Sequence, residues 1–170
     1  MERLWAPWRL QYVSRDKPDE CIFCSKPRAG DDRSNHIVQR GDHSFVMLNM
    51  YPYNNGHIMI SPFAHIACLE DLPPETLHEI MDLSQRCLVA LKQGFNAEGF
   101  NVGFNLGTVG GAGIQDHLHL HVVPRWIGDT NFMPVIADTR VIPQSLDATY
   151  DQLAEALGQK ESDVTVRRTR

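Results

Sequence analysis

The sequence predicts one domain that combines helices with antiparallel strands. Two tight turns between apolar segments are typical of hairpins, and one long amphipathic segment is typical of a helix. A third segment alternates histidine with leucine or valine, which is the pattern of a strand. A chain of 170 residues with 42% hydrophobic residues is long enough to bury one core. We therefore expect a sheet covered by helices.

The first half of the chain predicts three strands. We expect them at residues 36–39, 44–50 and 57–61, with a turn at 40–43 and a loop at 51–56. The loop ends in Asn54, Asn55 and Gly56, residues that accept the positive φ angles of tight turns. Residues 1–20 contain two tryptophans and predict an arm packed on the domain or on a partner subunit. Residues 25–34 read as a loop.

The second half predicts two helices and two strands. A long helix begins at Pro73 and Pro74, carries apolar residues at spacings of three and four, and ends at Gly94 as its cap. A strand at 100–106 and a glycine-rich loop at 107–115 follow. Residues 128–143 have no strong period, residues 145–157 predict a last helix capped by Gly158, and residues 159–170 read as a tail.

Composition excludes several classes of protein. A net charge of −5 and a pI near 5.9 argue against a broad nucleic-acid surface, which needs a basic stripe. No apolar run approaches the roughly 20 residues that span a bilayer, and the first residues do not resemble a signal peptide. We therefore expect a cytoplasmic protein without nucleic-acid or membrane partners. In that reducing compartment, the Cys21 and Cys24 pair indicates metal binding or redox chemistry.

The histidine-rich segment is the strongest functional signal. On a strand, His117, His119 and His121 share one face, while Leu118 and its apolar partners face a core. Such a row is an unusual packing choice for a polar face, and it indicates either nucleophilic or acid–base catalysis, or a catalytic zinc bound by a His-x-His pair. The adjacent loop offers backbone N–H groups to an anion, which favours His119 as a nucleophile towards phosphorus.

The segment from His117 to Val123 resembles the histidine triad (HIT) family motif, in which three histidines alternate with apolar residues. The resemblance extends to residues 3–9, 51–57, 99–107 and 123–126, and it points to the branch of diadenosine tetraphosphate phosphorylases and hydrolases. It implies an α+β fold with an antiparallel sheet of about five strands, a long helix and a C-terminal helix, joined in a two-fold homodimer. Residues 1–145 would form the HIT domain, with its N-terminal arm and C-x-x-C segment, and residues 146–170 the C-terminal helix and tail.

The resemblance also assigns roles to individual residues. His119 would be the nucleophile, His121 would contact the phosphate, and His57 would support the triad. The expected substrate-binding residues are Asn49 near the ribose, Asn105, Gly111 and Gly113 near the phosphates, and Trp126 against a base. Relatives often carry Ser, Thr or Gln in the loop to assist the leaving group, whereas this chain has Gly113 and Ile114 there, so Gln115 is the candidate substitute.

Zinc-bearing relatives place their ligands at positions that match Cys21, Cys24, His65 and His117. Two sulfurs and two imidazoles complete a closed tetrahedral set, so the expected cofactor is a structural zinc. Cys68, three residues after His65, is the rival ligand.

The resemblance implies that the substrate is an adenine nucleotide or a dinucleoside polyphosphate such as diadenosine tetraphosphate, cleaved at the α-phosphate. Residues 51–54 and 124–126 favour a phosphorylase over a hydrolase. A nucleoside phosphoramidate hydrolase and a nucleotide-binding sensor with low turnover stay open as alternatives.

Overall fold

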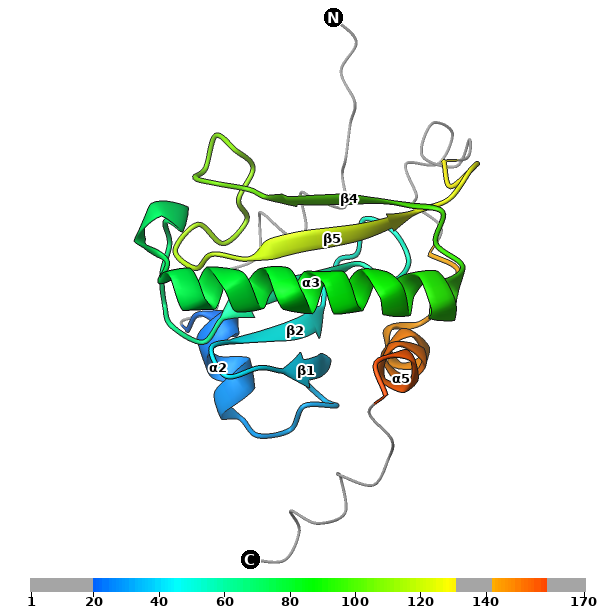
Figure 1. Ribbon diagram of the computed structural model, residues 1–170, viewed down its shortest axis with the longest axis horizontal. Helices are drawn as coiled ribbons and strands as arrows, with labels where there is room; N and C mark the ends of the chain where they lie inside the picture. The colour runs from blue at the N-terminus through cyan, green and yellow to red at the C-terminus, as the bar shows by residue number, and fades with distance from the viewer. Residues whose placement is uncertain (1–19, 131–141, 159–170) are drawn as a thin grey trace, which may run out of the picture.

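The computed structural model describes residues 20–130 and 142–158, in which five antiparallel strands form one sheet in the order β1-β2-β3-β5-β4 (Figure 1). The strands are β1 (Ile37–Arg40), β2 (Ser44–Leu48), β3 (Ile58–Pro62), β4 (Gly99–Phe104) and β5 (Leu120–Arg125). The helices are α2 (Ile22–Arg28), α3 (Pro74–Phe95) and α5 (Leu146–Ala156), with a 3₁₀ turn η1 at Leu69–Asp71. The predicted α+β class and five-stranded sheet are confirmed.

The helix α3 lies across one face of the sheet (Figure 1). Its apolar residues join those of β2, β3 and β5 in a buried cluster that includes Ile80, Leu91 and Val122. The predicted start at two prolines is confirmed, but the cap predicted at Gly94 is wrong, because Asn96 takes the left-handed conformation at φ 52°. Gly94 lies inside the helix instead, and an added Cβ there would lie 3.2 Å from the Cβ of Ala156 on α5.

The short helix α2 occupies part of the predicted loop at 25–34, so that prediction is wrong for its first residues. The sequence predicts that a helix is interrupted at Lys26, Pro27 and Arg28, and no side-chain hydrogen bond caps the start of α2. However, Phe23 and Pro27 lie one turn apart and are both buried. Packing of this face against the sheet therefore stabilises a helix that local propensity alone disfavours.

The histidine segment is only partly a strand. β5 begins at Leu120, so His121 lies in the strand while His117 and His119 precede it, which corrects the predicted strand start. The predicted alternation is nevertheless kept, because Leu118 and Leu120 are buried in the cluster beneath α3. The three histidines are buried outside that cluster.

The helix α5 packs against α3 at the end of the sheet near β1 (Figure 1). Its start is capped by the Ser145 side chain, which accepts from the backbone N–H of Ala148. Gly158 follows the helix with φ 78°, which confirms the predicted cap. Residues 1–19 of the expected arm, residues 131–141 and the expected tail at 159–170 lie outside the described residues. Among the described helices, none is long and apolar enough to cross a membrane.

Candidate active site and metal centre

The four predicted metal ligands meet beside the apolar cluster that contains Phe23. The ligand atoms of Cys21, Cys24, His65 and His117 all lie within 4.8 Å of one another. They come from the start of α2, the segment after β3 and the segment before β5. Cys68 is exposed and lies outside this cluster, so the structure does not bring the rival ligand to the site.

The spacing within the cluster matches a tetrahedral zinc site. The Sγ atoms of Cys21 and Cys24 lie 3.4 and 3.5 Å from Nδ1 of His117, and Nδ1 of His65 lies 3.2 Å from Nδ1 of His117. Zinc bond lengths and a tetrahedral angle give edges of about 3.6 Å between sulfur and nitrogen and about 3.3 Å between two nitrogens. The donor set and its spacing therefore fit zinc.

The His117 ring is oriented by the main chain. Its Nε2 lies 2.9 Å from the carbonyl of Pro62, and because a carbonyl only accepts, Nε2 carries the proton. Nδ1 is then the unprotonated nitrogen, and it faces the two cysteines. Burial lowers the pKa of His117 to about 4, with a smaller lowering from His65 and His119. The neutral ring that a metal requires is thus favoured.

The same reasoning assigns the His119 tautomer. Nδ1 of His119 lies 2.8 Å from the carbonyl of His117, so Nδ1–H donates and the lone pair is on Nε2. Burial lowers the pKa of His119, although the hydrogen bond to the His117 carbonyl acts to raise it. His119 is 6% exposed, so its ring is largely shielded from water while still reachable. An oriented, neutral imidazole with a lone pair on Nε2 is a nucleophile.

His57 and His121 form a directed chain of hydrogen bonds. The backbone N–H of Tyr53 donates to Nδ1 of His57 at 3.0 Å, so the proton of this ring is on Nε2. That Nε2–H lies 2.9 Å from Nδ1 of His121 and donates to it, which places the His121 proton on Nε2. Burial, with a smaller contribution from His119, lowers the pKa of His121 to about 4. His121 therefore offers one N–H donor beside His119, whose ring centroid is 4.9 Å away.

The predicted ribose and phosphate residues surround these histidines to different degrees. Nδ2 of Asn49 lies 3.4 Å from Nδ1 of His57, so Asn49 belongs to the same group. Asn105 directly follows β4, whose last residue, Phe104, pairs with Leu120. It therefore lies just past the end of β4, next to the segment that carries His119. The N–H of Gly111 donates to the Thr108 carbonyl within the loop.

The rest of the glycine-rich loop is at the surface. Gly113 and Gln115 are exposed, and Oε1 of Gln115 accepts from the Thr108 hydroxyl. Ile114 packs instead against the cluster of Phe23, Phe45 and Met59. Ile114, one of the two residues at which the resemblance leads us to expect a proton donor, therefore makes an apolar contact.

Trp126 lies apart from the histidines. Its indole N–H donates to the main-chain carbonyls of Phe95 and Asn96 at the end of α3, at 3.2 and 2.9 Å. Its ring packs against the cluster beneath α3. The structure thus does not bring Trp126 together with the triad, and its role against a base stays a prediction.

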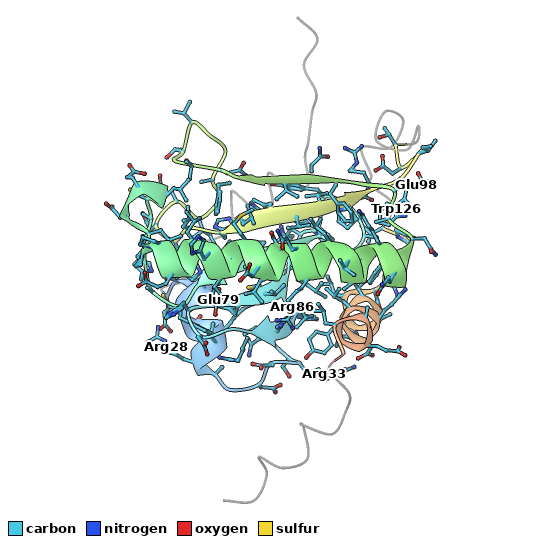
Figure 2. The ribbon with its side chains drawn as sticks, in the orientation of Figure 1. Arg28, Arg33, Glu79, Arg86, Glu98 and Trp126 are labelled. Carbon is cyan, nitrogen blue, oxygen red and sulfur yellow. The ribbon has the colours of Figure 1, made fainter. Side chains whose placement is uncertain are left out.

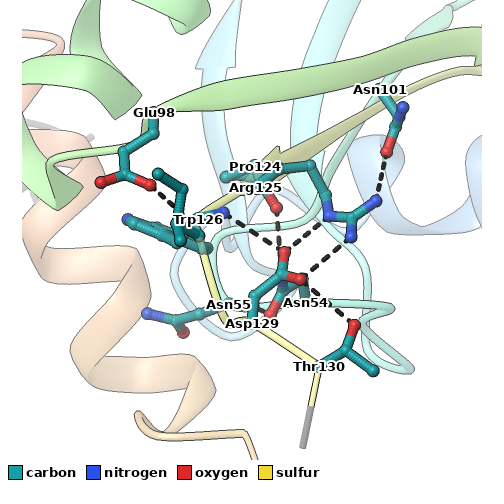
Figure 3. A network of polar contacts seen from close by, with 10 residues as sticks. Asn54, Asn55, Glu98, Asn101, Pro124, Arg125, Trp126, Asp129 and Thr130 are labelled. Carbon is teal, nitrogen blue, oxygen red and sulfur yellow. Dashed lines mark hydrogen bonds and ion pairs between the residues drawn. The ribbon is translucent and has the colours of Figure 1, made fainter.

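A polar network beside Trp126 fixes the end of β5. Asp129 accepts two hydrogen bonds from Arg125 at 2.6 and 2.9 Å, one from Asn54 at 2.8 Å and one from the backbone N–H of Trp126 (Figure 3). The hydrogen bond from Arg125 is the main reason that the pKa of Asp129 falls to about 2. Asn54 also donates to the Pro124 carbonyl. The network therefore anchors to β5 the loop at 51–56, which contains Tyr53.

Sequence reasoning missed Phe23. Its ring stacks on His119 with centroids 4.6 Å apart, and it lies 5.2 Å from the His117 ring. Its position between Cys21 and Cys24 was the available signal, because any residue there is close to His117 once the four ligands meet.

Comparison with known families matches residues 31–126 to the model of the HIT domain. An AP-4-A phosphorylase of Mycobacterium tuberculosis is 40% identical over 163 residues, which cover 91% of this chain and 83% of that protein. An uncharacterized HIT-like protein of the same species is 31% identical over 144 residues, which cover 84% of this chain and 96% of the relative.

Two solved structures have a similar fold. A Zn-bound histidine triad family protein from Mycobacterium smegmatis superposes with a TM-score of 0.67 at 26% identity, covering 84% of this chain and 96% of that one. The diadenosine triphosphate hydrolase of Plasmodium falciparum superposes with a TM-score of 0.58 at 21% identity, covering 75% and 76%.

Proposed function

The chain belongs to the HIT family, and from that premise we propose that it splits dinucleoside polyphosphates, diadenosine tetraphosphate in particular, at the α-phosphate through a nucleotidyl-His119 intermediate. One observation carries this proposal. The His117 carbonyl holds the proton of His119 on Nδ1 and leaves the Nε2 lone pair for attack. The 40% identity to an AP-4-A phosphorylase over most of both chains supports the choice of substrate.

In the first step, Nε2 of His119 attacks the α-phosphorus. A bond forms between nitrogen and phosphorus, and the bond to the bridging oxygen breaks with its electron pair leaving on the departing nucleotide, which is ATP for diadenosine tetraphosphate. ATP leaves as a stable anion, so it needs little protonation. This suits a loop whose position 114 is an apolar isoleucine rather than a proton donor.

His121 supports this step by donating a hydrogen bond. Its Nε2–H would meet a non-bridging oxygen of the α-phosphate, whose charge is redistributed as the bond to the leaving group breaks. His57 touches His121 rather than the phosphate, so it acts by holding the tautomer and ring direction of His121. Asn49 and Asn105 are the proposed ribose and phosphate contacts, together with the backbone of Gly111 and Gly113 and the amide of Gln115.

In the second step, we propose inorganic phosphate as the acceptor. An oxygen of phosphate attacks the phosphorus, the bond to His119 breaks with its electron pair returning to Nε2, and ADP is released. Phosphate is already an anionic nucleophile at neutral pH, whereas water requires a base to remove its proton. The name of the 40% identical relative supports the phosphorylase over the hydrolase.

Product analysis tests the acceptor. The purified protein is incubated with diadenosine tetraphosphate, with and without inorganic phosphate. We expect ADP and ATP only when phosphate is present. AMP and ATP without phosphate would identify a hydrolase, and the absence of any product would reject the substrate class.

Single-turnover labelling tests the nucleophile. A substrate labelled at the α-phosphate should leave acid-labile label on the wild-type protein and none on His119→Ala. Equal labelling of the two proteins would reject His119. Binding without any label on the wild type would instead support the nucleotide-binding sensor, and turnover of a nucleoside phosphoramidate at a comparable rate would support the phosphoramidate hydrolase.

We propose that Cys21, Cys24, His65 and His117 hold a structural zinc that ties α2 to the segment before β5. The spacing of the four ligand atoms supports this, as does the Zn-bound relative of similar fold. A closed set of four protein ligands leaves no open position for water, so the metal would supply rigidity rather than catalysis. Metal analysis should find about one zinc per chain and a loss in Cys21→Ser, with Cys68→Ser as the matched control.

We propose a homodimer that forms at the β4 edge of the sheet. Among the described strands β4 pairs only with β5, and Val102 on β4 is 46% exposed in the single chain. A second copy related by a two-fold axis would cover this edge. Light scattering should give the mass of a dimer for the wild type and of a monomer for Val102→Lys. Val89→Lys, at an exposed position on α3, should stay dimeric.

A further inference from the structure

Phe23 is the aromatic neighbour of the proposed nucleophile. The two rings stack with an interplanar angle of 28° and centroids 4.6 Å apart, and Phe23 is 1% exposed. The other described ring against His119 is His121, which meets it edge-on at 71°. One face of the His119 ring is therefore covered by the π face of Phe23.

The chemistry of the proposed intermediate puts a positive charge on that ring. His119 keeps its proton on Nδ1, where it donates to the His117 carbonyl. When Nε2 shares its lone pair with phosphorus, the ring gains a formal positive charge, and it loses this charge when the second step returns the electron pair. The group that accepts from Nδ1 is a neutral carbonyl rather than a carboxylate, so it offers no full counter-charge.

An aromatic face is attracted to such a cation. The ring quadrupole of phenylalanine has a negative face, and a cation within about 6 Å of its centroid is stabilised, more strongly where water is excluded. The 4.6 Å stack lies within this range, and both rings are buried. Neutral His119 gains less from the contact than the nucleotidylated ring, so the contact favours the intermediate selectively.

We propose that Phe23 is a positioning residue for nucleotidyl transfer, which fixes the plane of the His119 ring and stabilises the positive charge that this ring gains. The inference rests on the proposed function. The backbone of Phe23 is itself held between Cys21 and Cys24, so the metal cluster sets the place of the aromatic face. The cluster and the nucleophile are thereby linked through one side chain.

Substitution of Phe23 by a smaller residue would not separate this role from packing, because Phe23 also belongs to the buried cluster with Phe45 and Met59. Site-specific incorporation of mono-, di- and trifluorinated phenylalanine at position 23 keeps the ring shape and weakens its negative face by degrees. The readout is the single-turnover rate of label transfer from diadenosine tetraphosphate to the protein. The same series at Phe45, which stacks on Phe63 in the same cluster, is the matched control.

We expect the rate to fall stepwise with each fluorine at position 23, by about 3- to 30-fold for the trifluorinated ring, which spans the range from an exposed to a desolvated cation–π contact. The series at position 45 should leave the rate unchanged, and zinc content should be constant throughout. A flat series at position 23 would overturn the proposal, and so would equal losses at both positions, since these would indicate packing. A wild-type protein that takes up no label would reject the proposed function instead.

Discussion

His57 provides the sharpest test of the hydrogen-bond chain in the site. It is 1% exposed and donates from Nε2 to Nδ1 of His121, and it accepts from the backbone N–H of Tyr53. Replacement His57→Phe keeps a buried ring and removes the donor. Replacement His57→Gln keeps an N–H at the place of Nε2 and loses the ring nitrogen that faces Tyr53.

The expected magnitudes follow from what each histidine touches. One neutral hydrogen bond contributes about 0.5–1.5 kcal/mol, so His57→Phe should lower kcat by about 2- to 12-fold. His121→Ala removes the donor that meets the phosphate and should cost about 100- to 1000-fold. His119→Ala removes the nucleophile and should abolish transfer. His57→Gln should recover most of the loss seen in His57→Phe.

Steady-state kinetics on diadenosine tetraphosphate with phosphate measure these losses, and nitrogen chemical shifts report which His121 nitrogen carries the proton. If His57→Phe were as inactive as His119→Ala, His57 would contact the reacting phosphate directly, and the indirect role would be refuted. If kcat and the His121 tautomer were both unchanged, the chain from Tyr53 to His121 would have no function.

Three further variants test the surroundings of the site. Glu79, labelled on α3 in Figure 2, accepts from the Ser44 hydroxyl and two backbone N–H groups. Burial acts to raise the pKa of Glu79, but these hydrogen bonds outweigh burial and lower it. The ionised carboxylate therefore stabilises the folded protein above the unfolded pKa of about 4.3, and this stabilisation is lost as the pH falls through the folded pKa. Urea unfolding of Glu79→Gln should therefore show a loss of about 1–2 kcal/mol at pH 7 that disappears in acid. Asp129→Ala removes the hydrogen bond from Asn54 and should lower the free energy of unfolding by about 1–3 kcal/mol in the same assay. An unchanged value would show that the network does not stabilise the fold. Gly110→Ala in the glycine-rich loop would bring a Cβ onto the main-chain carbonyl of Leu106. It should lower kcat/KM about 10-fold or more while the thermal midpoint stays within a few degrees.

The sequence predicted most of the fold because its patterns are local. The amphipathic period of α3 and its two prolines, the glycine after α5 and the alternation around Leu120 each act within a few residues. The helix α2 could not be predicted in the same way. Its Phe23 packs on strands formed by later segments and its Pro27 is buried, whereas a local reading of Pro27 predicts only a break.

The candidate site divides along the same line. The resemblance to HIT proteins proposed all four metal ligands, and the structure brings those four together. The proton positions could not be predicted, because they depend on which groups the fold places against each ring nitrogen. The Pro62 carbonyl sets the His117 tautomer, and the Tyr53 N–H sets that of His57. The sequence marks neither group, since every residue carries a carbonyl and nearly every residue an N–H.

The late start of β5 explains how three similar side chains acquire different tasks. Inside a central strand, main-chain carbonyls already accept from neighbouring strands, so a side chain of the same segment must share the oxygen with that bond. His117 and His119 precede the strand, so the carbonyl of His117 can accept from Nδ1 of His119 while the Leu118 N–H bonds to Ile66. His121 lies in the strand, where it is paired with Met59 and takes its orientation from a side chain instead. In a strand that began at His117 the three histidines would still share one face, but the His117 carbonyl would also accept from a neighbouring strand, and this would weaken the hydrogen bond that keeps the His119 proton on Nδ1.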